Sequence, residues 1–188
     1  MNDIDKKKSM EGGMEIFARA SNYLGDIAKS ALANDGSKEE CAMIIPSIVL
    51  KGLACEIGLK TLLKIEGKNI EREHKLKTLY QQLEEGHRCE ISQVLLVSMM
   101  KVDEDYNEEK LNEDLNEINK AFIDWRYFYE KSQHVGVTFL EEFYKSIQMI
   151  VYSAMQENTK ESKILANTRD ALLPKLMPGE LDVSDIDL

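Results

Sequence analysis

Apolar side chains recur at every third or fourth position along most of this chain, the spacing that places them on one face of an α-helix. The pattern covers Met14–Ala33, Ala42–Ile65, Glu73–Leu83, Cys89–Val102, Asn107–Lys131 and a last stretch from Thr138. Cys89–Val102 alone also fits a strand, because its apolar residues run together. Ten glycines and three prolines in 188 residues are too few for the turns of a β fold. We therefore predict an all-α fold.

Helix-breaking and helix-capping residues separate these stretches. Asn34–Ser37 should end the first helix, and Pro46 is tolerated in the first turn of the next one, where its missing N–H has no partner. Gly67 should cap that helix at its C-terminus, and Gly86 should close the one after it. Thr138–Glu141 reads as a capping box that starts a new helix.

The composition changes near Glu157. A polar, helix-capable stretch follows, then Leu172–Glu180 and an acidic end. Pro174 and Pro178 should not lie inside a continuing helix. We predict two parts: a helical domain over residues 1–157 and a tail over 158–188.

The net charge of −10 is concentrated in two segments, Asp103–Asn119 and Asp170–Leu188. Without them the chain carries 21 acidic and 22 basic residues, so its body is close to neutral. This balance permits a contact with RNA, but no basic stripe suited to duplex DNA is present.

Three cysteines, Cys41, Cys55 and Cys89, are an odd number and have no C-x-x-C spacing. The pattern predicts neither a disulfide framework nor a zinc site, and it fits the reducing cytosol. No signal-like start and no run of about 20 apolar residues is found. We expect a cytoplasmic protein that does not enter a membrane.

Two histidines, each three positions after a glutamate, are the other metal candidates. Glu71/His74 and Glu84/His87 have the Glu-x-x-His spacing of di-iron bundles. Neither pair falls within a predicted helix interior, because Glu71 precedes a helix and Gly86 ends one. We predict no metal site and no cofactor.

Five of the thirteen aromatic residues lie within Phe122–Glu130, around a single arginine. In a helix, Arg126 lies at the edge of the aromatic stripe, with Glu130 one turn further on. Arg126 can pair with Glu130 as a structural bridge. Alternatively, its planar guanidinium can hold a phosphate or carboxylate.

Three segments occur in an order that resembles the HEPN superfamily of small helical domains: Leu53–Leu63, His74–Leu79 with Leu83 beyond it, and Trp125–Glu130. The resemblance covers roughly Met14 to Met155. It implies a four- or five-helix bundle, commonly a homodimer, found in bacterial defence and toxin–antitoxin systems with an antitoxin partner. Many members of the superfamily are metal-independent ribonucleases.

The superfamily's catalytic signature implies roles for two residues here. It consists of an arginine that binds the scissile phosphate and, about four to six residues later, a histidine that assists proton transfer. Arg126 takes the arginine's place, and His134 follows after seven intervening residues. Tyr127 and Glu130, beside the arginine, are candidate substrate-binding residues.

The C-terminal tail carries a second resemblance. Asn167–Val183 is similar to the extreme C-terminus of type I restriction–modification specificity subunits, except that Pro178 stands where those proteins usually have serine. Their large target-recognition domains are absent here, so the resemblance does not imply DNA recognition. It implies a docking element for a methyltransferase subunit, or a recombined fragment without a function of its own.

Together these patterns predict an all-α, HEPN-like bundle of five to six helices with a short C-terminal helical or extended tail. The leading hypothesis is a bacterial defence or toxin–antitoxin protein that binds RNA, with metal-independent endoribonuclease activity. The alternative is a non-catalytic helical interaction module associated with a type I restriction–modification system.

Overall fold

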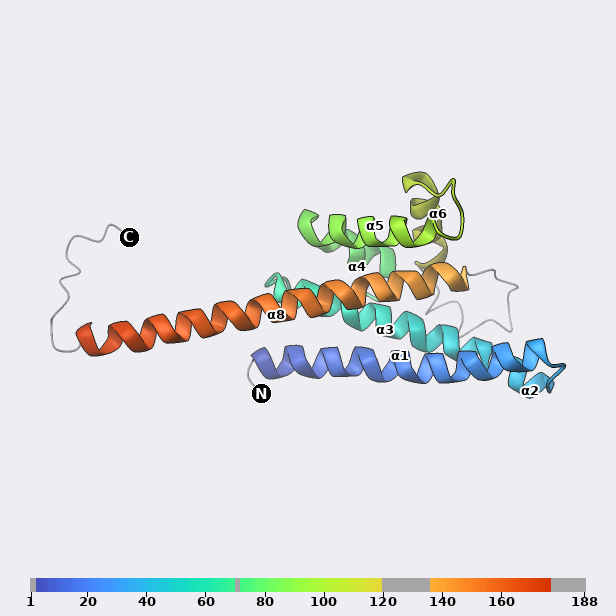
Figure 1. Cartoon of the computed structure of the whole chain (residues 1–188), viewed down its shortest axis with the longest axis horizontal. Helices are drawn as coiled ribbons and strands as arrows, with labels where there is room; N and C mark the ends of the chain where they lie inside the picture. Colours follow the sequence, from blue (N-terminus) through green and yellow to red (C-terminus); the bar gives the residue numbers. More distant parts are fainter. Residues whose placement is uncertain (1–2, 70–71, 120–135, 177–188) are drawn as a thin grey trace. The chain divides into compact units, whose positions relative to one another are not determined.

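The protein is all-α, as predicted. A computed structural model (Figure 1) describes residues 3–69, 72–119 and 136–176, and within these residues it contains helices, turns and no strand. The helices are α1 (Asp3–Ala33), α2 (Lys38–Cys41), α3 (Ile44–Ile65), α4 (Leu76–Gln82), α5 (Glu85–Met99), α6 (Glu108–Ile118) and α8 (Val137–Leu176).

The chain divides into two compact units, Met1–Val151 and Tyr152–Leu188. Helix α8 is continuous across this division. The predicted edge at Glu157 lies within that helix.

Helices α1 and α3 lie side by side and run antiparallel (Figure 1). Ser21 of α1 and Ser47 of α3 join them: each hydroxyl donates a hydrogen bond of 2.8 Å to the other residue's backbone carbonyl. Both serines are buried. One turn along α1, Gly25 lies so close to Ser47 that an added Cβ would meet the hydroxyl oxygen at 3.0 Å. The small residues therefore allow the two helices to approach closely.

The core is built around α3. Gly58 marks the place where α1, α3 and α8 meet, because a Cβ there would lie 2.5 Å from Cγ2 of Ile147 and 2.9 Å from Sδ of Met14. Phe139 and Phe143 of α8 stack with their ring centroids 5.9 Å apart, and both are buried. The first turns of α8 thus belong to the core of the first unit.

Three predicted helix boundaries are confirmed. Gly67 adopts φ 73° after α3, with its N–H bonded to Lys64 O and that of Lys68 bonded to Leu63 O, which is a Schellman cap. Asn34–Ser37 ends α1. The side chain of Asn107 caps α6 by accepting from two backbone N–H groups.

Two predicted boundaries are wrong. Gly86 does not close α4, which ends at Gln82; it lies near the start of α5, where an unbonded N–H is normal and glycine costs little. Thr138 does not cap α8, which begins one residue earlier, and Glu141 pairs with Lys51 instead of with the backbone. The capping box in the described residues is formed by Ser37 and Glu40.

Pro174 is a third correction. It lies inside α8, contrary to the prediction, but only two residues before the helix end. At that position proline removes one hydrogen bond of the last turns and interrupts no further helix.

Among the described residues, the helical stretch Lys38–Ile65 is long and apolar enough to cross a membrane by length and composition. Half of its most apolar window is buried inside the protein. Burial of this kind is expected of a core helix, and α3 supplies much of the core.

Candidate functional site

The four residues that the sequence singles out, Arg126, Tyr127, Glu130 and His134, lie outside the described residues. Their catalytic and substrate-binding roles stay predictions. Two other groups of polar side chains are described in full: one around Glu56, and one in a cavity between α1, α3 and α8.

The Glu56 cluster consists of Glu56, Lys60 and His74. Helix α3 places Glu56 and Lys60 one turn apart, and His74 precedes α4. Glu56 Oε1 lies 2.7 Å from Lys60 Nζ and 3.0 Å from His74 Nδ1. A carboxylate oxygen only accepts, so Nδ1 carries the proton of this bond. Proton exchange between His74 and a substrate would therefore use Nε2.

Burial differs sharply across this cluster. The Glu56 side chain is 6% exposed, whereas that of His74 is 52% exposed. The second oxygen of Glu56, Oε2, is buried and has no hydrogen-bond partner. A buried acceptor without a partner costs about 1–3 kcal/mol, so native proteins contain few of them. The cluster thus combines a buried carboxylate with a solvent-facing histidine, the arrangement by which carboxylates orient catalytic histidines.

Glu56 and His74 come from two of the segments that carry the HEPN resemblance, Leu53–Leu63 and His74–Leu79. Sequence reasoning missed this pairing, since it matched His74 with Glu71 by spacing. One signal was available: Glu56 is the only acidic residue of α3, the most apolar helix. A lone acid in a helix buried on most sides needs a partner from elsewhere in the chain.

The other histidine at glutamate spacing also bonds to a glutamate of the α3 region. His87 lies inside α5, not beyond a helix end, and its Nδ1 is 2.7 Å from Glu66 Oε1. The backbone N–H of Glu84 donates to the same oxygen at 3.0 Å. Lys68 Nζ forms an ion pair with Glu66 Oε2 at 2.8 Å and donates to Gln82 O.

The environment of Glu66 is that of a structural link. Burial alone would raise the pKa of its carboxyl, but the hydrogen bonds from Lys68, His87 and the Glu84 N–H together lower it below its ordinary value. Like Glu56 Oε2, the second oxygen of Glu66 is buried without a hydrogen bond of normal geometry, but it has the Lys68 ammonium at 2.8 Å as an ion-pair partner. The group fastens the end of α3 to the connection between α4 and α5.

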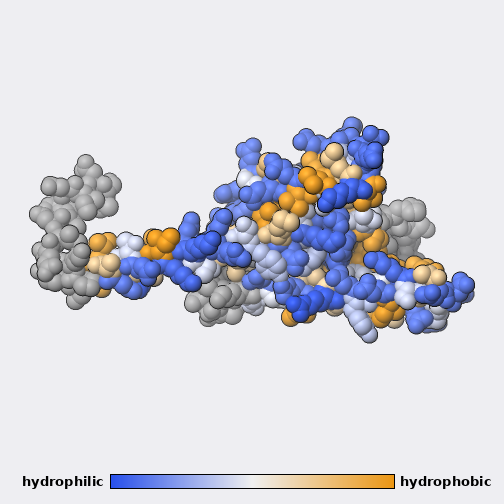
Figure 2. All heavy atoms as spheres, viewed as in Figure 1, coloured by the Kyte–Doolittle hydropathy of each residue, from blue (hydrophilic) through white to orange (hydrophobic). Residues whose placement is uncertain are grey.

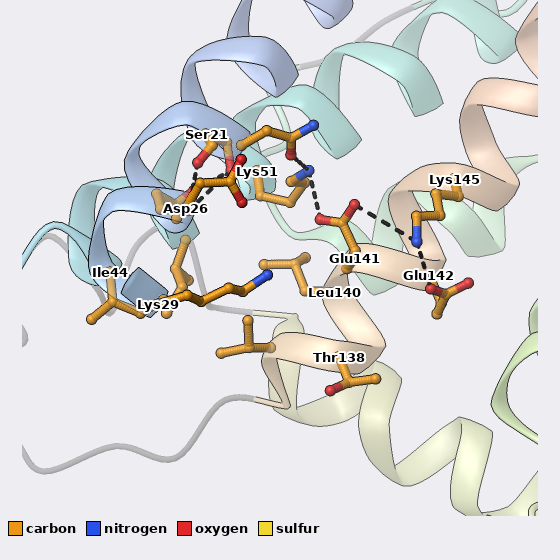
Figure 3. A pocket seen from close by; sticks show the side chains of 15 residues that line it. Ser21, Asp26, Lys29, Ile44, Lys51, Thr138, Leu140, Glu141, Glu142 and Lys145 are labelled. Atoms are coloured by element: carbon orange, nitrogen blue, oxygen red, sulfur yellow. Dashed lines mark hydrogen bonds and ion pairs between the residues drawn. The ribbon is translucent and has the colours of Figure 1, made fainter. Parts of the chain in front are cut away.

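A cavity of about 430 Å³ opens between α1, α3 and the start of α8 (Figure 3). Lys51 lies in its wall with a side chain only 5% exposed. Its ammonium is 2.6 Å from Glu141 Oε2 and 2.6 Å from Asn22 Oδ1, and it lies over the ring of Tyr144 at 4.7 Å from the centroid. Burial, followed by the nearby Cys55, Glu15 and Glu141, raises the pKa of Tyr144 to about 12.

The charges around this cavity balance. Its lysines are Lys29, Lys51 and Lys145, and its acids are Asp26, Glu141 and Glu142. Lys145 Nζ is 2.8 Å from Glu142 Oε1, while Lys29 reaches across the opening toward Leu140 (Figure 3). Because two of its three lysines are already neutralised by carboxylates, the cavity is a weak anion site.

The thiol buried in the core, Cys55, is not a candidate nucleophile. Burial raises the pKa of the Cys55 thiol far above its ordinary value, which keeps it protonated and unreactive. No group of three or more histidine, cysteine, aspartate or glutamate side chains in residues 3–69, 72–119 and 136–176 could hold a metal ion.

No family model, no curated protein and no solved structure matches this chain. The Glu56 cluster is therefore the candidate site on geometry alone.

Proposed function

We propose that this chain is a HEPN-like protein of bacterial defence that binds RNA and cleaves it without a metal ion. The observation that carries the proposal is the Glu56 cluster. It joins two segments of the resemblance through a buried carboxylate and an exposed histidine. The all-α fold agrees with the bundle that the resemblance implies.

The chemistry needs a proton acceptor, a proton donor and a cation near one phosphate. The ribose 2′-oxygen loses its proton to the acceptor and bonds to phosphorus. The bond from phosphorus to the 5′-oxygen breaks, and that oxygen takes a proton from the donor. The products are a 2′,3′-cyclic phosphate and a 5′-hydroxyl. In the proposal, Arg126 binds the phosphate, and His134 and His74 are the two candidate proton carriers, with Glu56 orienting His74.

The test is cleavage of single-stranded RNA by the purified protein in excess chelator, with the chemistry of the new ends determined. We expect cyclic phosphate ends. Arg126→Ala and His74→Ala should each lower the rate by about 10²-fold or more, the usual contribution of a positioned acid or base.

His87→Ala is the matched control for His74→Ala. It also removes a histidine bonded to a glutamate, but from the structural Glu66 link, so it should retain the cleavage rate once folding is verified. Intact RNA after incubation with the folded wild-type protein would reject the catalytic proposal. Full activity of the folded His74→Ala variant would show that the Glu56 cluster takes no part in catalysis.

One observation favours a second function, that of a non-catalytic interaction module. In the unit Tyr152–Leu188, α8 exposes four large apolar residues: Ile164, Leu165, Leu172 and Leu173. Exposed apolar side chains of this kind suit docking to a partner such as a methyltransferase subunit. A truncation after Glu157 should abolish co-purification with that subunit, and unchanged co-purification would reject the docking role.

A further inference from the structure

Helix α1 carries two apolar faces. One packs into the core through Met14, Ala18 and Ala28. On the opposite side of the helix, Ile16, Ala20, Tyr23 and Ile27 form what we call the outer stripe. Ile16 is 67% exposed and Tyr23 is 69% exposed. At the edge of the molecule over α1, Figure 2 shows separate hydrophobic residues among hydrophilic ones.

The outer stripe has the spacing of a helix–helix seam. Its residues follow one another at intervals of four, three and four positions, and seams between paired helices show the same intervals. Two oppositely charged side chains, Arg19 and Asp26, lie along one flank of the stripe. A soluble helix normally buries one stripe and solvates the rest, so a second apolar stripe needs a partner.

We propose that the outer stripe binds the same stripe of a second copy of this chain, with the two α1 helices antiparallel about a two-fold axis near Asn22. This inference rests on the proposed function only in that a HEPN-like protein is expected to be a homodimer. The new element is the surface through which the two copies bind, the outer stripe of α1. Three observations support the pairing. Apolar residues of the two stripes would face one another, opposite charges beside the stripes would meet, and a hollow beside the stripe could receive a side chain of the other copy.

The apolar register is self-complementary. With the axis near Asn22, Ile16 of each copy faces Ile27 of the other, and Ala20 faces Tyr23. Large residues then alternate with a small one along the seam, as in well-packed helix pairs. A two-fold interface requires this reciprocity, since the same patch serves both copies.

The charge register points to the same axis. When two identical helices pair antiparallel, one flank meets the same flank of the other copy. Arg19 then faces Asp26. Within its own helix Arg19 also contacts Glu15 at 3.5 Å. A parallel pairing would instead bring this flank against the opposite flank of the other helix, and Arg19 would not meet Asp26.

A hollow lies where the pairing needs one. A shallow cavity of about 420 Å³ is lined by Tyr23, Ile27 and Ala31, together with mostly polar residues of α1, α2 and their connection. In the antiparallel pair, Ile16 of the other copy lies opposite Ile27 and can enter this hollow. The contact occurs twice. Helix α1 has 31 residues and is therefore about 46 Å long, enough for an interface above the roughly 1,000 Å² of stable dimers.

Sedimentation equilibrium of the full chain over a concentration series tests the pairing. We expect the wild type to be a dimer and Tyr23→Asp to raise the dimer Kd at least about tenfold, because a central aromatic contact becomes a buried charge. Val97→Asp is the matched control. Val97 is also an exposed apolar residue, on α5, and its substitution should leave the Kd unchanged. A wild-type monomer, or a Tyr23→Asp dimer of wild-type affinity, would overturn the inference.

A charge exchange tests the register itself. Arg19→Asp places two aspartates opposite each other across the axis and should weaken the dimer. The double variant Arg19→Asp/Asp26→Arg restores opposite charges and should recover most of the wild-type affinity. Equal weakening by the single and double variants would reject the antiparallel register. RNA cleavage should be measured on the same samples. A protein that cleaves RNA without dimerising would refute the proposed interface and leave the proposed function standing.

Discussion

The ammonium of Lys51 lies 2.6 Å from the carboxylate of Glu141, and this ion pair joins α3 to the first turn of α8. The same ammonium bonds to Asn22 and so reaches α1 as well. One buried cation therefore links three helices of the first unit, α1, α3 and α8. Removing its counter-ion should be costly, since a buried charge without a partner is strongly destabilising.

Glu141→Ala should lower the free energy of unfolding by about 2 kcal/mol or more, whereas Lys51→Met, which removes the charge and keeps the volume, should cost less. Urea unfolding of both single variants and of the double variant measures the coupling. The loss in the double variant should be smaller than the two single losses added together. Additive losses would show that the pair does not interact.

Gly58→Ala and Gly12→Ala should have opposite effects on stability. A methyl group at Gly58 would lie 2.5 Å from Ile147, and forced overpacking costs about 1–3 kcal/mol. At Gly12 no atom lies within 4 Å of the added carbon, so alanine should stabilise α1 by about 0.5–1 kcal/mol. Thermal unfolding of the two variants compares them directly. A stabilised Gly58→Ala protein would contradict the close approach of α3 and α8.

Acid should weaken the link around Glu66. The pKa of this carboxyl is lowered from its ordinary value of 4.5, so its stabilising contribution is present above pH 4.5 and is lost as the pH falls through the folded-state pKa. Glu66→Gln should therefore be less stable than the wild type near neutral pH. The difference should shrink below pH 4.5, as measured by urea unfolding along a pH series. A difference that does not change with pH would mean that Glu66 is not held ionised by its neighbours.

Thiol labelling should discriminate among the cysteines. Cys89 is exposed and should react with iodoacetamide in the native protein, whereas Cys55 is buried with a raised pKa and should react only after unfolding. Mass spectrometry of peptides from labelled native and denatured samples gives the two rates. Labelling of Cys55 as fast as Cys89 would mean that the core around α3 opens readily.

The sequence predicts the fold well because helical periodicity is a local property. The stripes at Met14–Ala33 and Ala42–Ile65 correspond to α1 and α3, and Gly67 caps α3 through the backbone conformation that glycine permits. The error at Thr138 has a tertiary cause. Capping signals compete with tertiary bonds, and Glu141, the supposed capping partner, is taken by Lys51.

The candidate site is harder to predict. The bond between Glu56 and His74 joins residues 18 positions apart, and spacing alone pairs each histidine with a glutamate three residues earlier. Which glutamate meets which histidine depends on how α4 and α5 pack near the end of α3, and no local pattern records this. The outer stripe of α1 was visible as apolar residues, but the sequence cannot tell which of two stripes enters the core.

The reciprocal bonds between Ser21 and Ser47 have a consequence for how the chain finds its native state. Sliding α1 past α3 by one turn would keep apolar surface in contact but would take both buried hydroxyls away from their carbonyl acceptors. Alignments of α1 and α3 that are shifted by one turn are therefore disfavoured as soon as they form. Two small serine side chains thus select a single registry between these helices.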